Sequence, residues 1–175
     1  MKSKMKKLSV VCALLMLTLC GCGYRAGSLM HPQIKTIAIA PVSNDTMMYN
    51  AAAQMRGVLS ECFQSDGSLR LVSESSADCI LYAKVTGATF SQVSWDSNSD
   101  NSDDEFLPDQ WTLVISAKIT VMVPGRAEPL VRETTISGST TFVAGPDIES
   151  SRYYAVRQAC FQAAKQAVSR VTESW

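Results

Sequence analysis

An alternation of apolar and polar side chains between Trp111 and Val123, interrupted at Val114 and Met122, sets the strongest limit on the fold of this chain. The apolar positions are Trp111, Leu113, Ile115, Ala117, Ile119, Val121 and Val123, and the positions between them include Thr112, Ser116, Lys118 and Thr120. Because successive side chains of a β-strand point to opposite faces of the sheet, this segment predicts a strand with one buried and one solvated face. One-sided burial of this kind is typical of antiparallel sheets.

Four further segments have the composition of β-strands. They are rich in Val, Ile, Thr and aromatic residues, which are enriched in strands, and they begin at Ile34, Leu69, Cys79 and Leu130. Several of them are separated by Gly and Pro residues that favour turns. We therefore predict one sheet built mainly from neighbouring segments of the chain.

Two segments, residues 48–63 and 156–171, carry apolar side chains at three- and four-residue steps, as amphipathic helices do. Asn44 and Asp45 are good N-cap residues for the first helix, and Asp147 is one for the second. The predicted order of elements is β-α-β-β-β-β-α. We expect an α+β fold, with two helices packed on one face of a mostly antiparallel four- to five-stranded sheet.

The N-terminus has the pattern of a secretory signal. Residues 1–7 contain four lysines and no acidic residue, and residues 8–19 form an uncharged apolar run. A helix of that length rises about 18 Å, well short of the ~30 Å hydrocarbon core of a bilayer. We therefore expect residues 1–21 to be removed as a signal peptide.

Cys22 is the expected mature N-terminus. The segment is similar to lipoprotein signals, in which a small residue stands directly before the modified cysteine and a branched aliphatic residue stands three before it. Gly21 and Leu19 meet both conditions for Cys22, whereas Cys20 follows the bulky Leu19. We expect lipidation at Cys22; the alternative is an ordinary signal peptide with an incidental cysteine.

The residue after Cys22 indicates the destination of the protein. An aspartate there would resemble an inner-membrane retention signal, but the chain has Gly23. We therefore expect a protein of the outer membrane, anchored by its lipid on the periplasmic side. Residues 22–33 would form the lipidated N-terminus and linker, and residues 34–175 a single domain.

The charge of the mature chain argues against nucleic acid as a partner. Loss of the four signal lysines leaves twelve basic and sixteen acidic residues, so the net charge is about −4. A nucleic-acid-binding surface needs a basic patch or stripe, and none is visible in the sequence. A negatively charged ligand would have to be bound by a local cluster of lysines or arginines.

Three cysteines remain after Cys22: Cys62, Cys79 and Cys160. An exported protein reaches an oxidising compartment, so a disulfide is possible in principle. Cys62 and Cys160 both fall on apolar faces of predicted helices, and a bridge between them stays open as an alternative. We favour three small buried side chains.

Residues 96–109 form an acidic segment with five Asp and one Glu. Asp96, Asn98 and Asp100 resemble the start of an EF-hand calcium loop, but Asn101 and Leu107 stand where that loop requires Gly and Glu. We expect no metal site there. The segment predicts a long, mobile hairpin loop whose charges repel one another.

Enzymatic motifs are missing from the sequence. The single histidine, His31, lies in the predicted linker, and no zinc-protease, Cys-x-x-Cys, nucleophile-elbow or phosphate-loop motif is present. A catalytic histidine must be held within hydrogen-bonding reach of its partners by a rigid scaffold. We therefore expect a non-enzymatic protein without a cofactor.

Several stretches together resemble the LptE-like lipopolysaccharide-assembly lipoproteins. They are "CGYRAGS", "IKTIAIAPVSNDT", "SDGSLRLV" and "ADCILYAKVTGATFSQV", followed by a long closing helix. The resemblance implies two helices on one face of a sheet. It also implies a plug inside an LptD-like outer-membrane β-barrel that helps place lipopolysaccharide in the outer leaflet. A generic lipid-anchored interaction or scaffolding module of the envelope is the alternative.

Lys84 and Lys118 are the candidate contacts for an anionic lipid. The alternation places Lys84 on the solvated face with Tyr82, Thr86 and Phe90, and places Lys118 on the same face of the next strand. Two ammonium groups on one face would suit the phosphate of a sugar head group. Alternatively, Lys118 forms a surface ion pair with Glu133.

Overall fold

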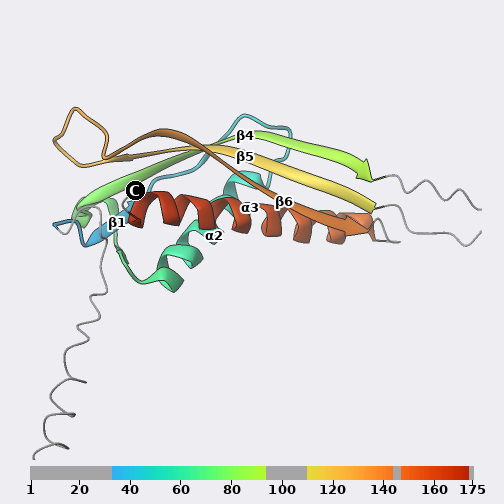
Figure 1. Cartoon of the computed structure of the whole chain (residues 1–175), viewed down its shortest axis with the longest axis horizontal. Coiled ribbons are helices and arrows are strands. Elements are labelled where there is room, and N and C mark those ends of the chain that lie inside the picture. The colour runs from blue at the N-terminus through green and yellow to red at the C-terminus, as the bar shows by residue number, and fades with distance from the viewer. Residues whose placement is uncertain (1–32, 94–109, 144–146, 174–175) are drawn as a thin grey trace, which may run out of the picture.

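Two helices cover one face of a six-stranded sheet (Figure 1). The computed structural model describes residues 33–93, 110–143 and 147–173. In chain order the elements are β1 (Thr36–Ile39), β2 (Ser43–Asn44), α2 (Ala51–Asp66), β3 (Arg70–Leu71), the short 3-10 helix η1 (Glu74–Ser76), β4 (Cys79–Val93), β5 (Gln110–Met122), β6 (Val131–Val143) and α3 (Ile148–Thr172). The predicted α+β fold with both helices on one face is confirmed.

The sheet is mixed, with the strand order β3-β1-β4-β5-β6. The long strands β4, β5 and β6 are antiparallel, as predicted. The short strands differ: β1 pairs in parallel with β3 and β4, and the two-residue β2 pairs in parallel with β4. Parallel pairing follows from the connections, because α2 carries the chain back between β1 and β3 and so forms a crossover.

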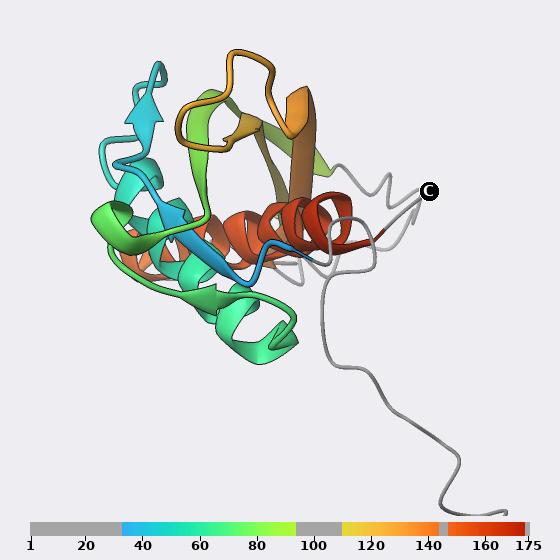
Figure 2. The ribbon, with the colours of Figure 1, turned by 90° about the vertical axis from the view of Figure 1, so that its left-hand side faces the viewer.

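The core lies between the sheet and the helices, which pack side by side beneath it (Figure 2). Leu113, Ile115 and Ile119 of β5 are fully buried, so the alternation that predicted this strand also identified its core face. The buried residues of α3 include the whole predicted stripe of Val156, Cys160, Ala163, Ala167 and Val171. One cluster of buried side chains joins both helices to the sheet.

Helix α3 approaches the sheet most closely at Gly138. A Cβ atom added there would lie 2.1 Å from the carbonyl oxygen of Ala159 and 2.6 Å from the backbone nitrogen of Ala163. The small side chains of Ala155, Ala159 and Ala163 are all buried on this side of α3. Strand β6 therefore lies against the backbone of α3 at a position that only glycine fits.

Helix α2 begins later than predicted. Its first residue is Ala51 and its N-cap is Asn50, so the assignment of Asn44 and Asp45 as N-caps was wrong. The Asn44 side chain instead closes a turn: its Oδ1 accepts from the N–H of Thr46, and its Nδ2 donates to the Met48 carbonyl oxygen at 2.8 Å. Asn and Asp cap such turns as readily as helices, so the pattern alone did not distinguish them. The helix ends at Asp66, and its C-cap, Gly67, adopts the left-handed conformation.

The N-terminus of α3 is capped as predicted. Asp147 accepts hydrogen bonds from the Ser150 N–H at 3.2 Å and from the Ser150 hydroxyl at 2.6 Å. These bonds hold the pKa of Asp147 below its usual value. Glu149 stands in the first turn, where the helix dipole favours a negative charge.

Replacement of Ile115 by alanine should lower the free energy of unfolding by about 2–5 kcal/mol, the usual range for a large-to-small change in a core. Ile115 is fully buried under the helices. The neighbouring Val114 faces the open side of the sheet, so Val114→Ala should change stability by less than about 1 kcal/mol. Urea denaturation of both variants measures the difference, and an equal loss in the two would contradict the assigned strand faces.

Asp78 ties the start of β1 to the start of β4. Its Oδ2 accepts the backbone N–H of Lys35 at 3.0 Å and that of Thr36 at 2.9 Å, while its own N–H donates to the Thr36 hydroxyl at 2.9 Å. The bond from the Lys35 backbone, followed by those from Thr36, lowers the pKa of the Asp78 carboxyl. The charged form of Asp78 is therefore favoured in the folded chain.

This lowered pKa predicts a pH-dependent contribution to stability. Because the pKa of Asp78 is lower in the folded than in the unfolded chain, its contribution is complete above the unfolded value of about 3.9 and is lost as the pH falls through the folded value. The Asp78→Asn variant should lose less stability than the wild type as the pH is lowered below about 4. Urea denaturation as a function of pH tests this, and parallel curves would contradict it.

Candidate functional site

The predicted lipidation site, Cys22, and the acidic segment 96–109 lie outside the described residues. The described part of the chain begins at Gln33, just before β1. In Figure 1 the start of β1 and the end of α3 lie at one end of the long axis, and the end of β4 and the start of β5 lie at the other. A tether entering through β1 therefore meets the domain at one end of its length.

Lys84 and Lys118 are directly opposite each other on β4 and β5. Both point away from the helices, as predicted, and each is bound to a carboxylate. The Lys84 Nζ lies 2.6 Å from Asp45, and the Lys118 Nζ lies 2.7 Å from Glu133. The second contact is the cross-strand ion pair foreseen as the alternative.

The four charged side chains form a row across the outer face of the sheet, in the order Asp45, Lys84, Lys118 and Glu133. The side chains of both pairs are about half exposed. Exposed ion pairs of this type contribute less than about 1 kcal/mol each, so an anionic ligand could compete for the lysines at small cost. The two flanking carboxylates make the row neutral as a whole.

Phe90 does not share the face of Lys84, contrary to the prediction. A β-bulge between Val85 and Gly87 inserts Thr86 as an extra residue in β4. A shift of one residue moves every later side chain to the other face. Phe90 consequently lies opposite Leu113 on the helix side, where its ring contacts Phe142 edge to face at 6.2 Å.

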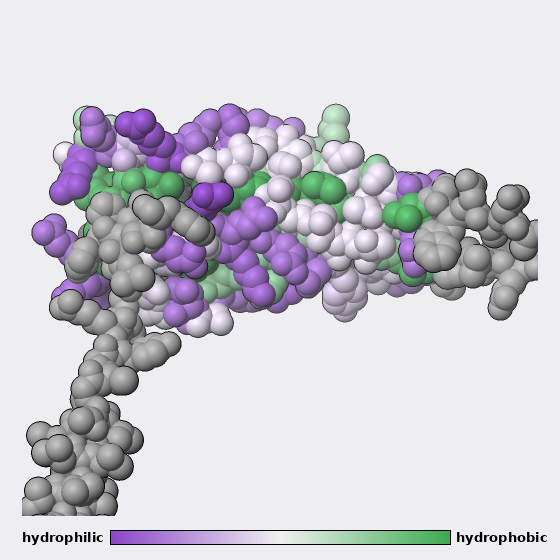
Figure 3. All heavy atoms as spheres, viewed as in Figure 1, coloured by the Kyte–Doolittle hydropathy of each residue, from purple (hydrophilic) through white to green (hydrophobic). Residues whose placement is uncertain are grey.

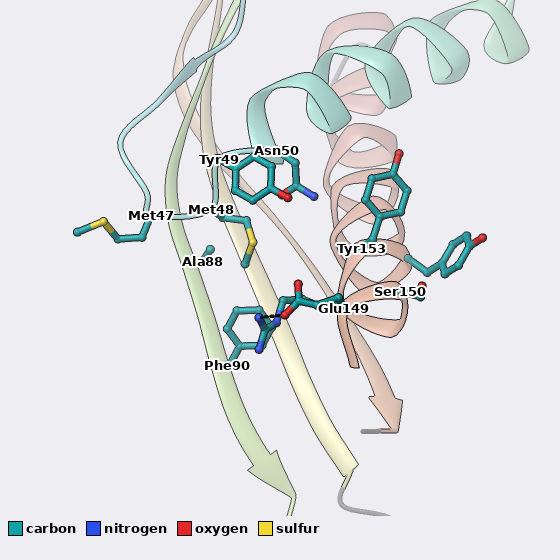
Figure 4. A pocket seen from close by; sticks show the side chains of 11 residues that line it. Met47, Met48, Tyr49, Asn50, Ala88, Phe90, Glu149, Ser150 and Tyr153 are labelled. Atoms are coloured by element: carbon teal, nitrogen blue, oxygen red, sulfur yellow. Dashed lines mark hydrogen bonds and ion pairs between the residues drawn. The ribbon is translucent and has the colours of Figure 1, made fainter. Parts of the chain in front are cut away.

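A cleft of about 710 Å³ opens between β4, the segment before α2 and the start of α3 (Figure 4). We call it the aromatic cleft. It is lined by Met47, Met48, Tyr49, Asn50, Ala88, Phe90, Glu149, Ser150, Arg152, Tyr153 and Tyr154. Its volume is in the range of ligand-binding clefts.

The rim of the aromatic cleft is unusually exposed for its residue types. Met47 is fully exposed, Tyr49 is 90% exposed and Tyr154 is 68% exposed. On the face of the molecule that Figure 3 shows, the apolar residues form only a broken band among polar ones. Exposed methionine and tyrosine are enriched at protein interfaces, so the rim has the composition of a candidate contact surface.

Arg152 closes the floor of the aromatic cleft. Its guanidinium lies 5.6 Å from the centre of the Phe90 ring and 2.9 Å from Glu149. Its Nε and the Oδ1 of Asn50 are buried without a hydrogen-bond partner. Buried polar atoms without partners are rare in native proteins, and ordered water commonly satisfies such atoms.

The sequence patterns did not identify the aromatic cleft. Two signals were present: the run Met47-Met48-Tyr49 and the pair Tyr153-Tyr154. Neighbouring residues in a helix cannot both face the core, and Met47 and Tyr49 stand outside the helical period of α2. Large apolar residues that break the period of their element could have indicated a contact surface.

Cys62, Cys79 and Cys160 are buried and free. The Cys62–Cys160 bridge that had been left open is not formed, and the favoured reading of three buried thiols is confirmed. Burial raises the pKa of all three thiols, to about 11 for Cys79 and about 12 for Cys160. Because the thiolate is the reactive form, these cysteines are unreactive at neutral pH.

The part of the chain that the structure describes contains neither a metal-binding cluster nor a membrane-spanning helix. No three side chains of the His, Cys, Asp and Glu types are grouped so that they could hold a metal ion. No helix in this part of the chain is long and apolar enough to cross a membrane.

No known family's sequence profile matches the chain, and no curated protein sequence matches it. Solved structures with the same fold do exist. A candidate lipoprotein from Caulobacter crescentus matches with a TM-score of 0.52 at 12% identity, over 78% of this chain and 87% of the other. A hypothetical protein from Chlamydia trachomatis matches with a TM-score of 0.54 at 12% identity, over 79% and 96%.

A variant of PelC from Paraburkholderia phytofirmans, which forms a dodecamer, matches with a TM-score of 0.50 at 10% identity, over 83% of this chain and 95% of the other. At such low identity these similarities concern the fold alone. The chain thus has a fold that is also found among bacterial lipoproteins.

Proposed function

We propose that this chain is a lipid-anchored, non-enzymatic component of the outer membrane that plugs and supports an LptD-like β-barrel in lipopolysaccharide assembly. The observation that carries the proposal is the one-sided architecture. Both helices pack on the same face of the sheet, and no described element covers the other face of β4, β5 and β6. This is the architecture that the resemblance to LptE-like lipoproteins implies.

The outer sheet face is suited to contact with another protein. It carries short hydroxyl side chains such as Thr112, Ser116 and Ser139 along the full length of the long strands. Short polar side chains leave a flat surface that can lie against a barrel wall, and they form hydrogen bonds without the desolvation cost of charges. The lipid at Cys22 would hold the domain at the periplasmic side of the membrane.

Gentle detergent extraction of the native full-length protein tests the proposal. We expect one large β-barrel protein to co-purify in equal amount. When the protein is depleted from cells, we expect less lipopolysaccharide to reach the outer leaflet of the outer membrane. A second envelope lipoprotein, extracted in parallel, controls for adhesion to detergent micelles. Extraction as a free protein, with normal lipopolysaccharide at the surface, would exclude the plug function.

A generic interaction or scaffolding module of the envelope is the second candidate. The ion pairs of Lys84 with Asp45 and of Lys118 with Glu133 favour it, because the lysines are already bound to carboxylates. Under this function the domain would bind a protein partner but not lipopolysaccharide. The two functions therefore differ in one measurable property, the binding of lipopolysaccharide by the purified domain.

Replacement of both Lys84 and Lys118 by glutamate should reduce lipopolysaccharide binding by at least about tenfold, because it places four carboxylates in one row. Thermal denaturation must show a normally stable double mutant. A control in which Arg56 and Arg126 become glutamate makes the same change in net charge away from the row. Equal binding by the two double mutants would remove Lys84 and Lys118 as lipid contacts.

A further inference from the structure

Half of β4 has a strand neighbour on only one side. On the β5 side it is paired along its whole length, up to Val93. On the other side β1 and β2 pair only with its first part, and the last hydrogen bond runs from the Asp45 N–H to the Val85 carbonyl oxygen at 2.9 Å. Among the described residues, no strand pairs with this side of residues 86–93, which we call the open edge.

The strand register shows which backbone groups the open edge offers. The side chains of Leu81 and Val85 face the helices. The backbone carbonyl oxygens of these two residues accept hydrogen bonds from the β1–β2 side. Beyond the bulge the helix-facing positions are Ala88, Phe90 and Gln92, which lie opposite Ile115, Leu113 and Trp111. Residues on one face of a strand direct their N–H and C=O groups to the same edge. The amides of Ala88, Phe90 and Gln92 therefore point away from β5 and toward the open edge.

The other two edges of the described sheet are protected. The edge strand β6 packs along α3, and the Ser137 N–H donates to the Gln166 Oε1 of that helix at 3.2 Å. The opposite edge strand, β3, is only two residues long. Short edge strands and covering helices are common ways in which proteins prevent unwanted strand pairing.

The open edge has little protection of this kind. Its sequence, TGATFSQV, contains no proline and no charged residue. Residues 91–93 are exposed, and the bulge lies at the beginning of the segment. An uncharged, exposed edge of this length is a template for pairing with another strand.

The aromatic cleft lies directly beside the open edge. Ala88 and Phe90 belong to both, and Met48, Tyr49 and Tyr153 form the cleft wall nearby (Figure 4). A strand added at this edge would direct every second side chain toward the helices, and so into the cleft. The Glu149–Arg152 ion pair leaves the cleft without net charge, which favours an uncharged apolar side chain.

We propose that an extended, uncharged segment of a partner protein, with apolar residues at every second position, binds this chain by adding a strand to the open edge of β4. Main-chain hydrogen bonds to Ala88, Phe90 and Gln92 would provide the affinity, and the aromatic cleft would select the side chains. The added strand would lie on the same side of β4 as β1 and β2, and it would extend the pairing that these two strands begin. This inference goes beyond the barrel plug and also holds for a scaffolding module.

Hydrogen exchange of the full mature chain, followed residue by residue by NMR, tests the edge directly. In the free chain the amides of Ala88, Phe90 and Gln92 should exchange fast, and those of Thr89 and Ser91 should be protected by β5. The probe is a ten-residue peptide of four Thr-Val pairs between two terminal lysines. On its addition, protection should appear at the three open amides and chemical shifts should change in the cleft.

Two pairs of variants separate binding at the edge from unfolding. Gln92→Pro removes an open-edge N–H, and Ser139→Pro removes the matched outward N–H of β6; proline is tolerated where a strand's N–H faces away from the sheet. Gln92→Pro should weaken peptide binding by about tenfold, and Ser139→Pro should not. Tyr49→Ser, which trims a 90% exposed cleft side chain, should also weaken binding, whereas Tyr82→Ser on the outer face should not.

Four results would overturn the proposal. The first is protection of Ala88, Phe90 and Gln92 in the free monomer, which would mean that the edge is already occupied. The second is protection that rises with protein concentration together with a dimer mass in ultracentrifugation, which would identify a second copy as the occupant. The third is absence of protection on adding the peptide, and the fourth is equal binding by the Gln92→Pro and Ser139→Pro variants.

Discussion

Replacement of Gly138 by alanine should lower the free energy of unfolding by about 3 kcal/mol or more, at the upper end of the cost of overpacking. The added methyl group would lie 2.1 Å from the Ala159 carbonyl oxygen, closer than any real contact. Of the three atoms nearest to this methyl group, two are backbone atoms of α3, the Ala159 carbonyl oxygen and the Ala163 nitrogen, so rotation of a side chain cannot relieve the clash. The helix would have to move off the sheet and leave its buried alanines poorly packed.

Gly87→Ala is the matched control, because a Cβ atom there would have its nearest neighbour at 3.7 Å, an ordinary contact. Its stability should change by less than about 1 kcal/mol. Thermal and urea denaturation of both variants give the comparison. A Gly138→Ala protein as stable as Gly87→Ala would show that α3 lies farther from β6 than described.

Replacement of Cys22 by serine should abolish membrane anchoring. The acyl chains are expected on the sulfur and the amine of this residue, and stable anchoring needs two or more chains, at about 0.8 kcal/mol per buried CH₂ group. The variant should accumulate as an uncleaved or soluble form. Membrane fractionation measures the loss, and intact-protein mass spectrometry measures the lipid.

Cys20→Ser is the control for Cys22→Ser, because it changes the neighbouring thiol and leaves Gly21 and Leu19 in place. It should be lipidated and anchored as the wild type is. An acylated Cys22→Ser protein of normal mass would contradict the assignment of the lipidation site.

The sequence pattern correctly predicts those elements in which the buried apolar residues keep one regular spacing along the whole element. Every odd-numbered residue from 111 to 123 is apolar, and the buried residues of β5 all belong to this set, although Val114 and Met122 place apolar side chains on the other face. The stripe from Val156 to Val171 keeps the helical period and is buried throughout. In both cases burial of one continuous face decides the structure, so sequence and structure agree.

The errors occur where a single residue changes the local geometry. The bulge at Thr86 reverses the faces of β4 and moves Phe90 from the solvated side to the core side. Gly87 was the signal that the prediction did not use, because an isolated glycine within a strand often marks a β-bulge. The start of α2 was missed for a similar reason, since Asn44 caps a turn that precedes the helix.

The candidate contact surfaces were only partly predictable. The alternation predicted that Lys84 and Lys118 share the outer face, because Lys84 precedes the bulge, but their direct pairing was not predicted, because the long loop left the strand register open. The aromatic cleft and the open edge depend on where α3, β2 and the Met47–Asn50 segment come together, and these segments are far apart in the sequence. Contacts between segments that are far apart in the sequence cannot be predicted from the spacing of apolar residues within one segment.

The bond network of Asp78 has a mechanical consequence. β1 lies between β3 and β4 near the start of the described residues, so tension from the proposed anchor at Cys22 would enter the domain through β1. Its parallel bonds to both neighbours run across the line of pull and are loaded together in shear. Asp78 accepts the Lys35 and Thr36 amides at the start of β1, where this tension would first act on the sheet. Acidification that protonates Asp78 would therefore weaken the attachment of the tether before it weakens the core.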